Sequence, residues 1–266
     1  MDEFLLQKIL VAAKKGQSFA FATIVESTLK GTPRKTGAKM AVLEDGSLYG
    51  TIGGGRNEQN AKFECLDSIK TKKSKLVTYN YFGQEGQSIC GGRIKVFIEP
   101  FIGKKHLIIC GAGHIALPLS AMAKMLNFKV TIIDDRKEFA QKSRFPHVDS
   151  IVLGSHSKKL AEIPITSETY IMIVTQGNEY DFECLKIAIK TKASYIGVIS
   201  SKVKRIKFFK RLRQGGVSEK TLSQIHAPAG LDIGAQTPEE IAISIISEII
   251  AKQSGAIKGA LKFNQK

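Results

Sequence analysis

The stretch from His106 to Asp135, HLIICGAGHIALPLSAMAKMLNFKVTIIDD, constrains the fold more than any other part of this sequence. An apolar run precedes a glycine turn, a helical pattern follows the turn, and a second apolar run ends at Asp134 and Asp135. The turn, Gly111 to Ala116, has the form G-x-G-x-x-A, and its context is that of a βαβ unit. Such units build parallel sheets with helices on both faces. The sequence therefore predicts a Rossmann-like parallel-sheet domain.

The rest of the chain divides on either side of residues 101 to 105. Beyond this point, apolar strands are expected at SIVLG, YIMIVTQG and YIGVISS, with helices between them. Before it, the pattern indicates helices over 3–15 and 57–69, and strands at SFAFATIVEST, LVTYNYF and RIKVFIEP, with a hairpin turn at Asp45-Gly46. We expect an α/β protein with an N-terminal α+β domain, residues 1–103, and a Rossmann-like C-terminal domain, residues 104–266.

Two helix starts in the C-terminal half have clear signals. Thr237 to Glu240 combines an N-cap, a proline at the first helical position and a glutamate three residues after the cap. Ser200 and Ser201 open a basic helix whose Ile206, Phe209 and Leu212 are expected to pack inward. The two serines follow a strand at the edge where doubly wound sheets bind ligands, so they are candidate ligand contacts as well as the start of a solvated helix.

The glycine turn has a known chemical use. In dinucleotide-binding folds, residues such as Gly111 and Gly113 let a pyrophosphate reach the helix N-terminus, and an acid about 20 residues later binds ribose hydroxyls. Asp134 follows Gly111 by 23 residues, which suits that role. The same glycines also allow close packing of strand and helix. His114 is a candidate ligand contact, with a surface or capping histidine as the alternative.

A second glycine-rich turn, Gly53-Gly54-Gly55, precedes the helix expected over 57–69. Bare N–H groups and a helix dipole favour an anion here, while a bulged turn is the structural alternative. Glu58, in the first helical turn, is either a cap or a partner for the amino-pyrimidine edge of a ligand. Arg34, in GTPRKTG, is a candidate phosphate ligand or an exposed loop residue.

Cysteine usage argues against a disulfide scaffold or a structural zinc site. The four cysteines are widely spaced and form no CxxC pair. Cys65, Cys110 and Cys184 are expected in the core. Cys90 differs because Gly91, Gly92 and a nearby arginine follow it, an arrangement that leaves a thiol approachable and lowers its pKa. A small buried hydrophobe is the alternative for Cys90.

Charge and hydropathy limit the partners. The net charge of +16 favours an anionic ligand, but the sequence has no nucleic-acid signature, so no nucleic-acid partner is expected. No apolar run approaches a membrane span, and the N-terminal residues are atypical of a signal peptide. We therefore expect a cytoplasmic protein with no membrane partner.

Taken together, the chain resembles the xanthine dehydrogenase accessory protein family (XdhC/CoxI). The matching segments run in order along nearly the whole chain: GTPRKTGAKM, DGSLYGTIGGGRNE, CGGRIKVFIEP, ICGAGHIALPLSAMAKMLNFKVTIIDDR, YIGVISSKVKR and HAPAGLDIGAQTPEEIAISIISEI. Two departures stand out. Gln176 occupies a position where the family usually has histidine, and Arg56-Asn57 replaces small or apolar residues after the three glycines.

The resemblance implies a carrier without turnover of its own. Members bind molybdenum cofactor in its molybdopterin form, support its sulfuration by a cysteine desulfurase, and deliver it to a molybdenum hydroxylase of the xanthine dehydrogenase type. A homodimer is common among them. For this chain the resemblance implies cofactor contacts from the glycine turns and basic residues, with Cys90 as a metal ligand. A nicotinamide-dependent oxidoreductase, NAD(P) being the cofactor at the Rossmann-like site, is the alternative function.

Overall fold

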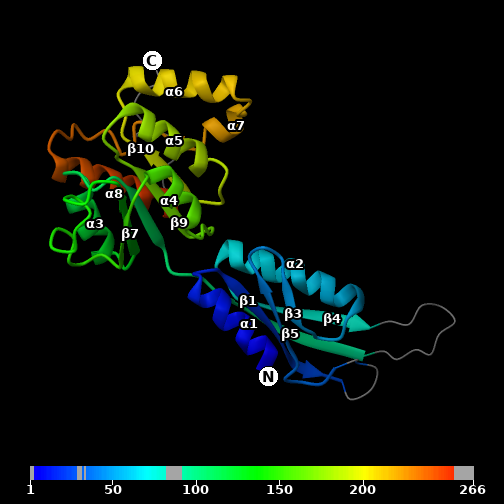
Figure 1. Ribbon diagram of the computed structural model, residues 1–266. Coiled ribbons are helices and arrows are strands. Elements are labelled where there is room, and N and C mark those ends of the chain that lie inside the picture. Colours follow the sequence, from blue (N-terminus) through cyan, green and yellow to red (C-terminus); the bar gives the residue numbers. More distant parts are fainter. Residues whose placement is uncertain (1–2, 29–31, 33, 82–91, 255–266) are drawn as a thin grey trace. The chain divides into compact units, whose positions relative to one another are not determined.

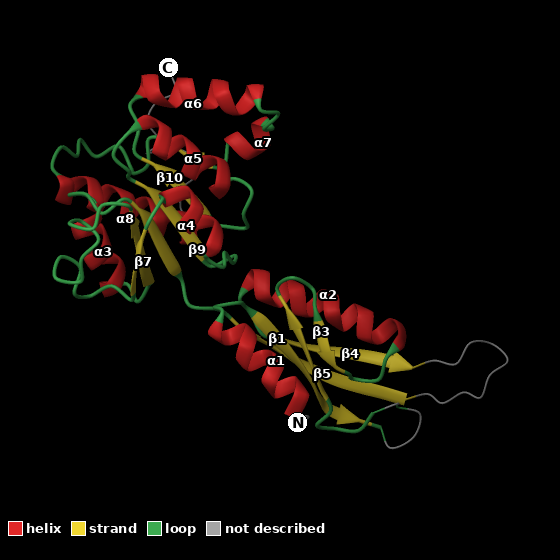
Figure 2. Cartoon of the chain, in the orientation of Figure 1, coloured by secondary structure: helices red, strands yellow, loops and turns green. Residues whose placement is uncertain are grey.

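The computed structural model describes residues 3–28, 32, 34–81 and 92–254, and it divides into two compact units, Met1–Gly103 and Lys104–Lys266. Each unit contains one β-sheet with helices on both of its faces (Figures 1 and 2). The α/β class, with an N-terminal α+β part and a Rossmann-like part after it, is confirmed.

The first unit is built on an antiparallel sheet with the strand order β3-β2-β1-β5-β4. Its elements are α1 (Glu3–Lys14), β1 (Phe19–Ser27), β2 (Lys39–Leu43), β3 (Leu48–Gly50), α2 (Gly55–Thr71), β4 (Lys75–Tyr81) and β5 (Gly92–Phe101). The hairpin expected around Asp45-Gly46 joins β2 and β3.

Strand alternation divides the core of this unit into two layers. Ala20 and Ala22 on β1 pack with Ala61 and Cys65 of α2, whereas Phe19 packs with α1 on the opposite face. Successive residues of a strand point to opposite faces, so β1 carries both layers. As a result α2 and α1 cover opposite faces of the sheet (Figure 1).

The second unit contains a six-stranded sheet with the order β11-β10-β9-β6-β7-β8, and every strand pair in it is parallel. This is the doubly wound arrangement, whose direction of winding reverses between β6 and β9. Its elements are β6 (His106–Cys110), α3 (Ala116–Met125), β7 (Lys129–Asp134), β8 (Ser150–Leu153), α4 (His156–Glu162), β9 (Thr169–Ile173), α5 (Asn178–Ala188), β10 (Tyr195–Val198), α6 (Lys202–Gln214), α7 (Glu219–Leu222), β11 (Ile225–His226) and α8 (Pro238–Ser254).

Helices cover both faces of the parallel sheet (Figure 2). Leu107 and Ile109 of β6 belong to the core layer under α3 and α8, and Ile108 and Cys110 belong to the layer under α4, α5 and α6. A strand buried on both faces is apolar at most of its positions, which explains the apolar run from Leu107 to Cys110 in the sequence. The expectation that Cys65, Cys110 and Cys184 are core residues is confirmed.

The predicted capping signals are confirmed, but the prediction that Ile206 of α6 packs inward is wrong. Thr237 Oγ1 accepts a hydrogen bond from Glu240 N, and Glu240 Oε2 accepts one from Thr237 N, which is a reciprocal capping box. In α6, Phe209 and Leu212 are buried, but Ile206 is 67% exposed and Phe208 is buried in its place. The helix is therefore rotated so that its 208–209–212 face, and not its 206 position, contacts the sheet layer.

Across the described ranges, no helix has both the length and the apolar character needed to span a lipid bilayer.

Candidate functional site

The candidate ligand-binding residues of the first unit that the structure describes lie at one end of its sheet. Strands β1, β3 and β4 finish at this end, and β2 and β5 begin there. The connection from β1 to β2, which contains Arg34, and the glycine turn after β3 therefore both lie at it. Asn57 Nδ2 donates to the carbonyl of Asn80, 3.2 Å away, and this contact joins the first turn of α2 to the end of β4.

The three glycines at this end all require backbone that favours glycine. Their φ angles are 132° at Gly53, 74° at Gly54 and 67° at Gly55. Nothing lies within 4 Å of where a Cβ would stand on Gly54 or on Gly55. These two residues are therefore glycine because of their backbone conformation and not because of crowding, and the space beside them is open at the N-terminus of α2.

Glu58 organises this turn from inside. Its Oε2 accepts hydrogen bonds from Ile52 N at 3.0 Å, from Gly54 N at 3.1 Å and from the Thr51 hydroxyl. Burial alone raises the pKa of Glu58, but these hydrogen bonds together outweigh burial and hold the pKa below its ordinary value. The sequence left Glu58 either as a cap or as a partner for a ligand, and its observed contacts with backbone N–H groups are those of a cap. The N–H groups that remain for an anion begin at Gly55.

The other candidates of the first unit have different surroundings. Arg34 is exposed, and Gly92 is buried at the start of β5, opposite Tyr81. Arg93, the neighbour expected to influence Cys90, pairs with Glu26, with 3.4 Å between Arg93 Nη2 and Glu26 Oε1, and its effect on Cys90 stays a prediction. Cys90 and Gly91 lie outside the described residues.

In the second unit, the candidate residues occupy the carboxyl edge of the parallel sheet. The glycine turn follows β6 at the point where the winding direction reverses, which is the position of ligand crevices in this architecture. Gly111 N donates to the carbonyl of Ile133 on β7, whereas Gly113 has open space where a side chain would be. His114 is exposed in the turn that leads to α3, and the cap residue Ile115 makes no side-chain cap bond.

Asp134 lies at the end of β7 with its carboxylate fully buried. Oδ2 accepts from Ala112 N at 2.6 Å, and both oxygens accept from the Arg136 guanidinium. Burial by itself raises the pKa of Asp134, yet the bonds from Arg136, the nearby His156 ring and the bond from Ala112 N hold it well below its usual range. The carboxylate thus holds the glycine turn in place through Ala112 N. Its role in binding ribose stays a prediction, because a ribose hydroxyl would have to replace one of these hydrogen bonds.

Arg136 also connects the loops that follow the two strands flanking β6. Its Nη1 donates to Gln176 Oε1 at 2.6 Å, so the loop after β7 is tied to the loop after β9 across the glycine turn after β6. The guanidinium lies 3.9 Å from the ring centroid of Phe139. Gln176, the residue that departs from the family pattern, is therefore a hydrogen-bond partner at the point where the winding reverses.

Ser200 and Ser201 line a cavity of about 530 Å³ between the end of β10 and the loop 228–236. Ser201 caps α6 by accepting a bond from Lys204 N at 3.2 Å. Ser200 Oγ is buried and has no hydrogen-bond partner among the described groups. Both hydroxyls keep an O–H donor for a ligand, and Ser200 is the one that is buried without any hydrogen bond.

The sequence analysis identified neither Arg136 nor the pair of His226 and the buried Glu248, in which His226 Nδ1 and Glu248 Oε1 are 2.7 Å apart. Arg136 follows the paired acids by one residue, so its proximity to Asp134 was a usable signal. His226 and Glu248 come from a two-residue strand and a long helix, and no local spacing connects them.

Comparisons with known proteins agree with this architecture. Residues 107–249 match the XdhC Rossmann domain, and residues 12–80 match the XdhC and CoxI family. The crystal structure of a xanthine dehydrogenase from Bacillus halodurans shares the fold, with a TM-score of 0.52, 23% identity and coverage of 98% of both chains.

Three curated relatives match as well. The chain is 32% identical to the uncharacterized protein YqeB of Escherichia coli K12 over 91% of this chain and 45% of YqeB. It is 30% identical to a probable xanthine dehydrogenase subunit of Bacillus subtilis 168, over 58% of this chain and 45% of that protein. It is 21% identical to the molybdenum cofactor insertion chaperone PaoD of Escherichia coli K12, over 92% of this chain and 86% of PaoD. The aligned regions span about half the length of the first two relatives. With the Rossmann-domain match covering more than half of its residues, the chain belongs to the XdhC and CoxI family.

Proposed function

We propose that this chain is an accessory protein that binds molybdenum cofactor, in its molybdopterin form, and assists its insertion into a molybdenum hydroxylase of the xanthine dehydrogenase type. Family membership and the similarity to PaoD, named as an insertion chaperone, support the proposal. The match to a probable xanthine dehydrogenase subunit supports the class of client. The structural observation that carries it is the open glycine turn at the start of α2.

The residues of that turn suit the chemistry of the cargo. Molybdopterin carries a phosphate, and the N–H groups that begin at Gly55 lie at the positive end of a 17-residue helix. Gly54 and Gly55 leave open space where side chains would stand. In this proposal Glu58 holds the turn in shape, the exposed Arg34 supplies a positive charge from the adjacent connection, and a Cys90 thiolate ligates molybdenum.

The partners follow from the same proposal. A cysteine desulfurase supplies the sulfur that the cargo receives, the chain acts as a cytoplasmic homodimer, and it has no turnover of its own. Binding of the cargo is favoured by the net charge of +16 because molybdopterin is anionic.

A nucleotide at the second unit is the alternative, and one observation favours it. The parallel sheet has the strand order of dinucleotide-binding domains, with an unobstructed Gly113 in its glycine turn. Against an NAD(P)-dependent oxidoreductase, both oxygens of Asp134 already accept bonds from Arg136. Equilibrium dialysis against NAD and NADP, followed by an assay for dehydrogenase turnover, distinguishes an enzyme from a carrier.

The test of the carrier function is cofactor retention by the purified full chain. The protein is produced in cells that synthesise molybdenum cofactor, and its molybdenum and molybdopterin contents are measured for the parent, Gly54→Val and Gly16→Val. Gly16 is a matched control because its φ of 73° nearly equals that of Gly54, it also has open space, and it precedes β1 at the opposite end of the sheet. Both variants carry a similar backbone strain, on the order of 1 to 3 kcal/mol.

We expect the parent and Gly16→Val to retain about one molybdopterin per chain, and Gly54→Val to lose most of it, because a β-branched side chain fills the open space. Equal retention by the two variants contradicts the glycine-turn site. Absence of molybdopterin from the parent, together with tight NAD binding and turnover, contradicts the carrier function itself.

A further inference from the structure

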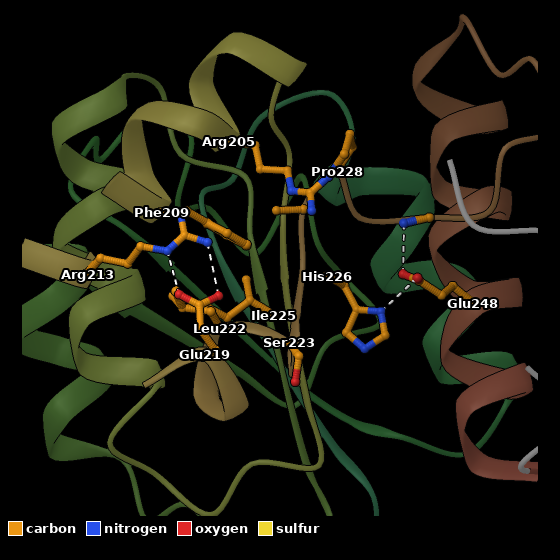
Figure 3. Close-up of a pocket in the computed structure, with 12 residues that line it drawn as sticks. Arg205, Phe209, Arg213, Glu219, Leu222, Ser223, Ile225, His226, Pro228 and Glu248 are labelled. Atoms are coloured by element: carbon orange, nitrogen blue, oxygen red, sulfur yellow. Dashed lines mark hydrogen bonds and ion pairs between the residues drawn. The ribbon is translucent and has the colours of Figure 1, made fainter. Parts of the chain in front are cut away.

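A cavity of about 320 Å³ lies beside β11 in the second unit (Figure 3). Helices α6 and α7, strand β11 and the loop that follows it supply its walls, and Glu248 reaches it from α8. Phe209, Leu222 and Ile225 form an apolar side. A concave site with apolar walls and a few polar groups is the usual form of a small-molecule pocket.

A buried carboxylate orients the histidine of this cavity. Glu248 is 4% exposed and accepts from the Tyr195 hydroxyl at 2.6 Å, from Gly230 N at 2.9 Å and from His226 Nδ1 at 2.7 Å. Burial alone raises the pKa of Glu248, but its contacts, His226 foremost, hold that pKa below its ordinary value. A carboxylate so placed fixes the orientation of the His226 ring through Nδ1.

The other ring nitrogen is left for a ligand. Figure 3 shows His226 Nε2 on the side of the ring away from Glu248, and no described residue hydrogen-bonds it. Histidines held at Nδ1 by a carboxylate present Nε2 as their working atom, as a donor when the ring is protonated.

The charges around the cavity leave one cation without a carboxylate partner. Arg213 and Glu219 neutralise each other through two hydrogen bonds, Arg213 Nε to Glu219 Oε1 and Arg213 Nη2 to Glu219 Oε2 (Figure 3). Arg205 is half-buried, and its guanidinium lies 5.2 Å from the ring centroid of Phe209. No ion pair joins Arg205 to an acid within the described ranges. The unmatched groups of the cavity are therefore a guanidinium and a carboxylate-supported imidazole.

We propose that this cavity binds a small molecule that bears a phosphate monoester or carboxylate group on an apolar body. Arg205 and His226 Nε2 bind the oxyanion, and Phe209, Leu222 and Ile225 contact the body. Arginine is suited to this task because its guanidinium matches both anions with parallel hydrogen bonds. The cavity belongs to the second unit and the glycine turn proposed for molybdopterin belongs to the first, so this proposal does not depend on the proposed function.

The test titrates full-length protein with phenyl phosphate, benzoate and neutral benzyl alcohol. Calorimetry gives the dissociation constants, and long-range 1H–15N spectra report the ring nitrogens of His226. The decisive variant is Arg205→Met, with Arg211→Met as control. Arg211 belongs to the same helix, pairs with Glu179 and does not line the cavity. Because Arg205 has no ion pair to lose, its variant is expected to fold, and a melting curve checks this.

We expect at least one of the two anions to bind with a dissociation constant of about 1 mM or lower and to shift His226 Nε2. Arg205→Met should weaken that binding at least about tenfold, and Arg211→Met less than about twofold. Binding of phenyl phosphate alone assigns the site to phosphate monoesters, and binding of benzoate alone assigns it to carboxylates. The proposal is overturned if neither anion binds, if benzyl alcohol binds as tightly, if His226 is unaffected, or if folded Arg205→Met binds like the parent.

Discussion

Gly111 faces the backbone of Val174 so closely that a Cβ at Gly111 would lie 2.4 Å from the carbonyl oxygen of Val174. The two residues follow β6 and β9, the strands between which the winding direction reverses. Val174 N in turn donates to the carbonyl of Cys110 at 2.8 Å. The first glycine of the turn is thus required by strand packing as well as by its φ of 113°, whereas Gly113 is not.

We therefore expect Gly111→Ala to destabilise the fold and Gly113→Ala to have little effect. Backbone atoms cannot yield to the new methyl group of Gly111→Ala, so its free energy of unfolding should fall by about 2 to 4 kcal/mol. The new methyl group of Gly113→Ala enters open space, so this variant should change the free energy of unfolding by less than about 1 kcal/mol. Urea unfolding of both variants is the measurement. A loss as large in Gly113→Ala as in Gly111→Ala contradicts the packing role.

Asp134 should make stability depend on pH in the acidic range. Its pKa is lowered in the folded state, so its stabilisation is fully present above the unfolded-state pKa of about 3.9. The stabilisation is lost progressively as pH falls below that value. At pH 7, Asp134→Asn should lower the free energy of unfolding by about 2 to 4 kcal/mol, because Arg136 and Ala112 N lose a charged acceptor.

Urea unfolding at pH 7, 4 and 2.5 tests this expectation. The difference between parent and Asp134→Asn should narrow as pH falls. A difference that is constant with pH shows that the charge of Asp134 is not what stabilises the turn.

Glu58→Ala should weaken the glycine turn of the first unit. The variant leaves Ile52 N, Gly54 N and the Thr51 hydroxyl without their common acceptor, and loss of such a cap costs about 1 to 2 kcal/mol. Glu64→Ala in the same helix removes only a surface ion pair with Lys75 and should cost less than about 1 kcal/mol. Thermal or urea unfolding compares the two, and equal losses argue against a capping role for Glu58.

Cys90→Ser and Cys110→Ser should separate cargo binding from stability. Serine keeps the size of cysteine but is a poor ligand for a soft metal, so Cys90→Ser is expected to lower molybdenum retention or transfer to the client. Cys110 has no exposed surface, and a hydroxyl there costs about 1 to 3 kcal/mol, seen as a lower melting temperature. Molybdenum content, client reconstitution and melting curves are measured for both. If Cys90→Ser loads and delivers cofactor like the parent, Cys90 is not a ligand.

Local patterns in the sequence predicted most of the strands and helices and their order, although not α7 or β11. Nearly continuous apolar runs predicted the buried strands β6 and β9, because a strand covered on both faces is apolar at most of its positions. The capping box at Thr237 and Glu240 and the hairpin turn at Asp45-Gly46 were also predictable. These signals lie within a few residues of each other, and they act through backbone dihedral preferences and side-chain periodicity, both readable along the chain.

The hydrogen-bond partners of the polar side chains were decided by the tertiary structure. Glu58 and Asp134 were recognisable as candidates, but their carboxylates are occupied by N–H groups of the turns that they support. His226 and Glu248 are 22 residues apart and meet because β11 and α8 pack in the same unit, and Arg136 reaches Gln176 across 40 residues. Such pairs depend on strand order and helix packing, which bring together residues that no periodicity relates, so their chemistry is defined only once the chain has folded.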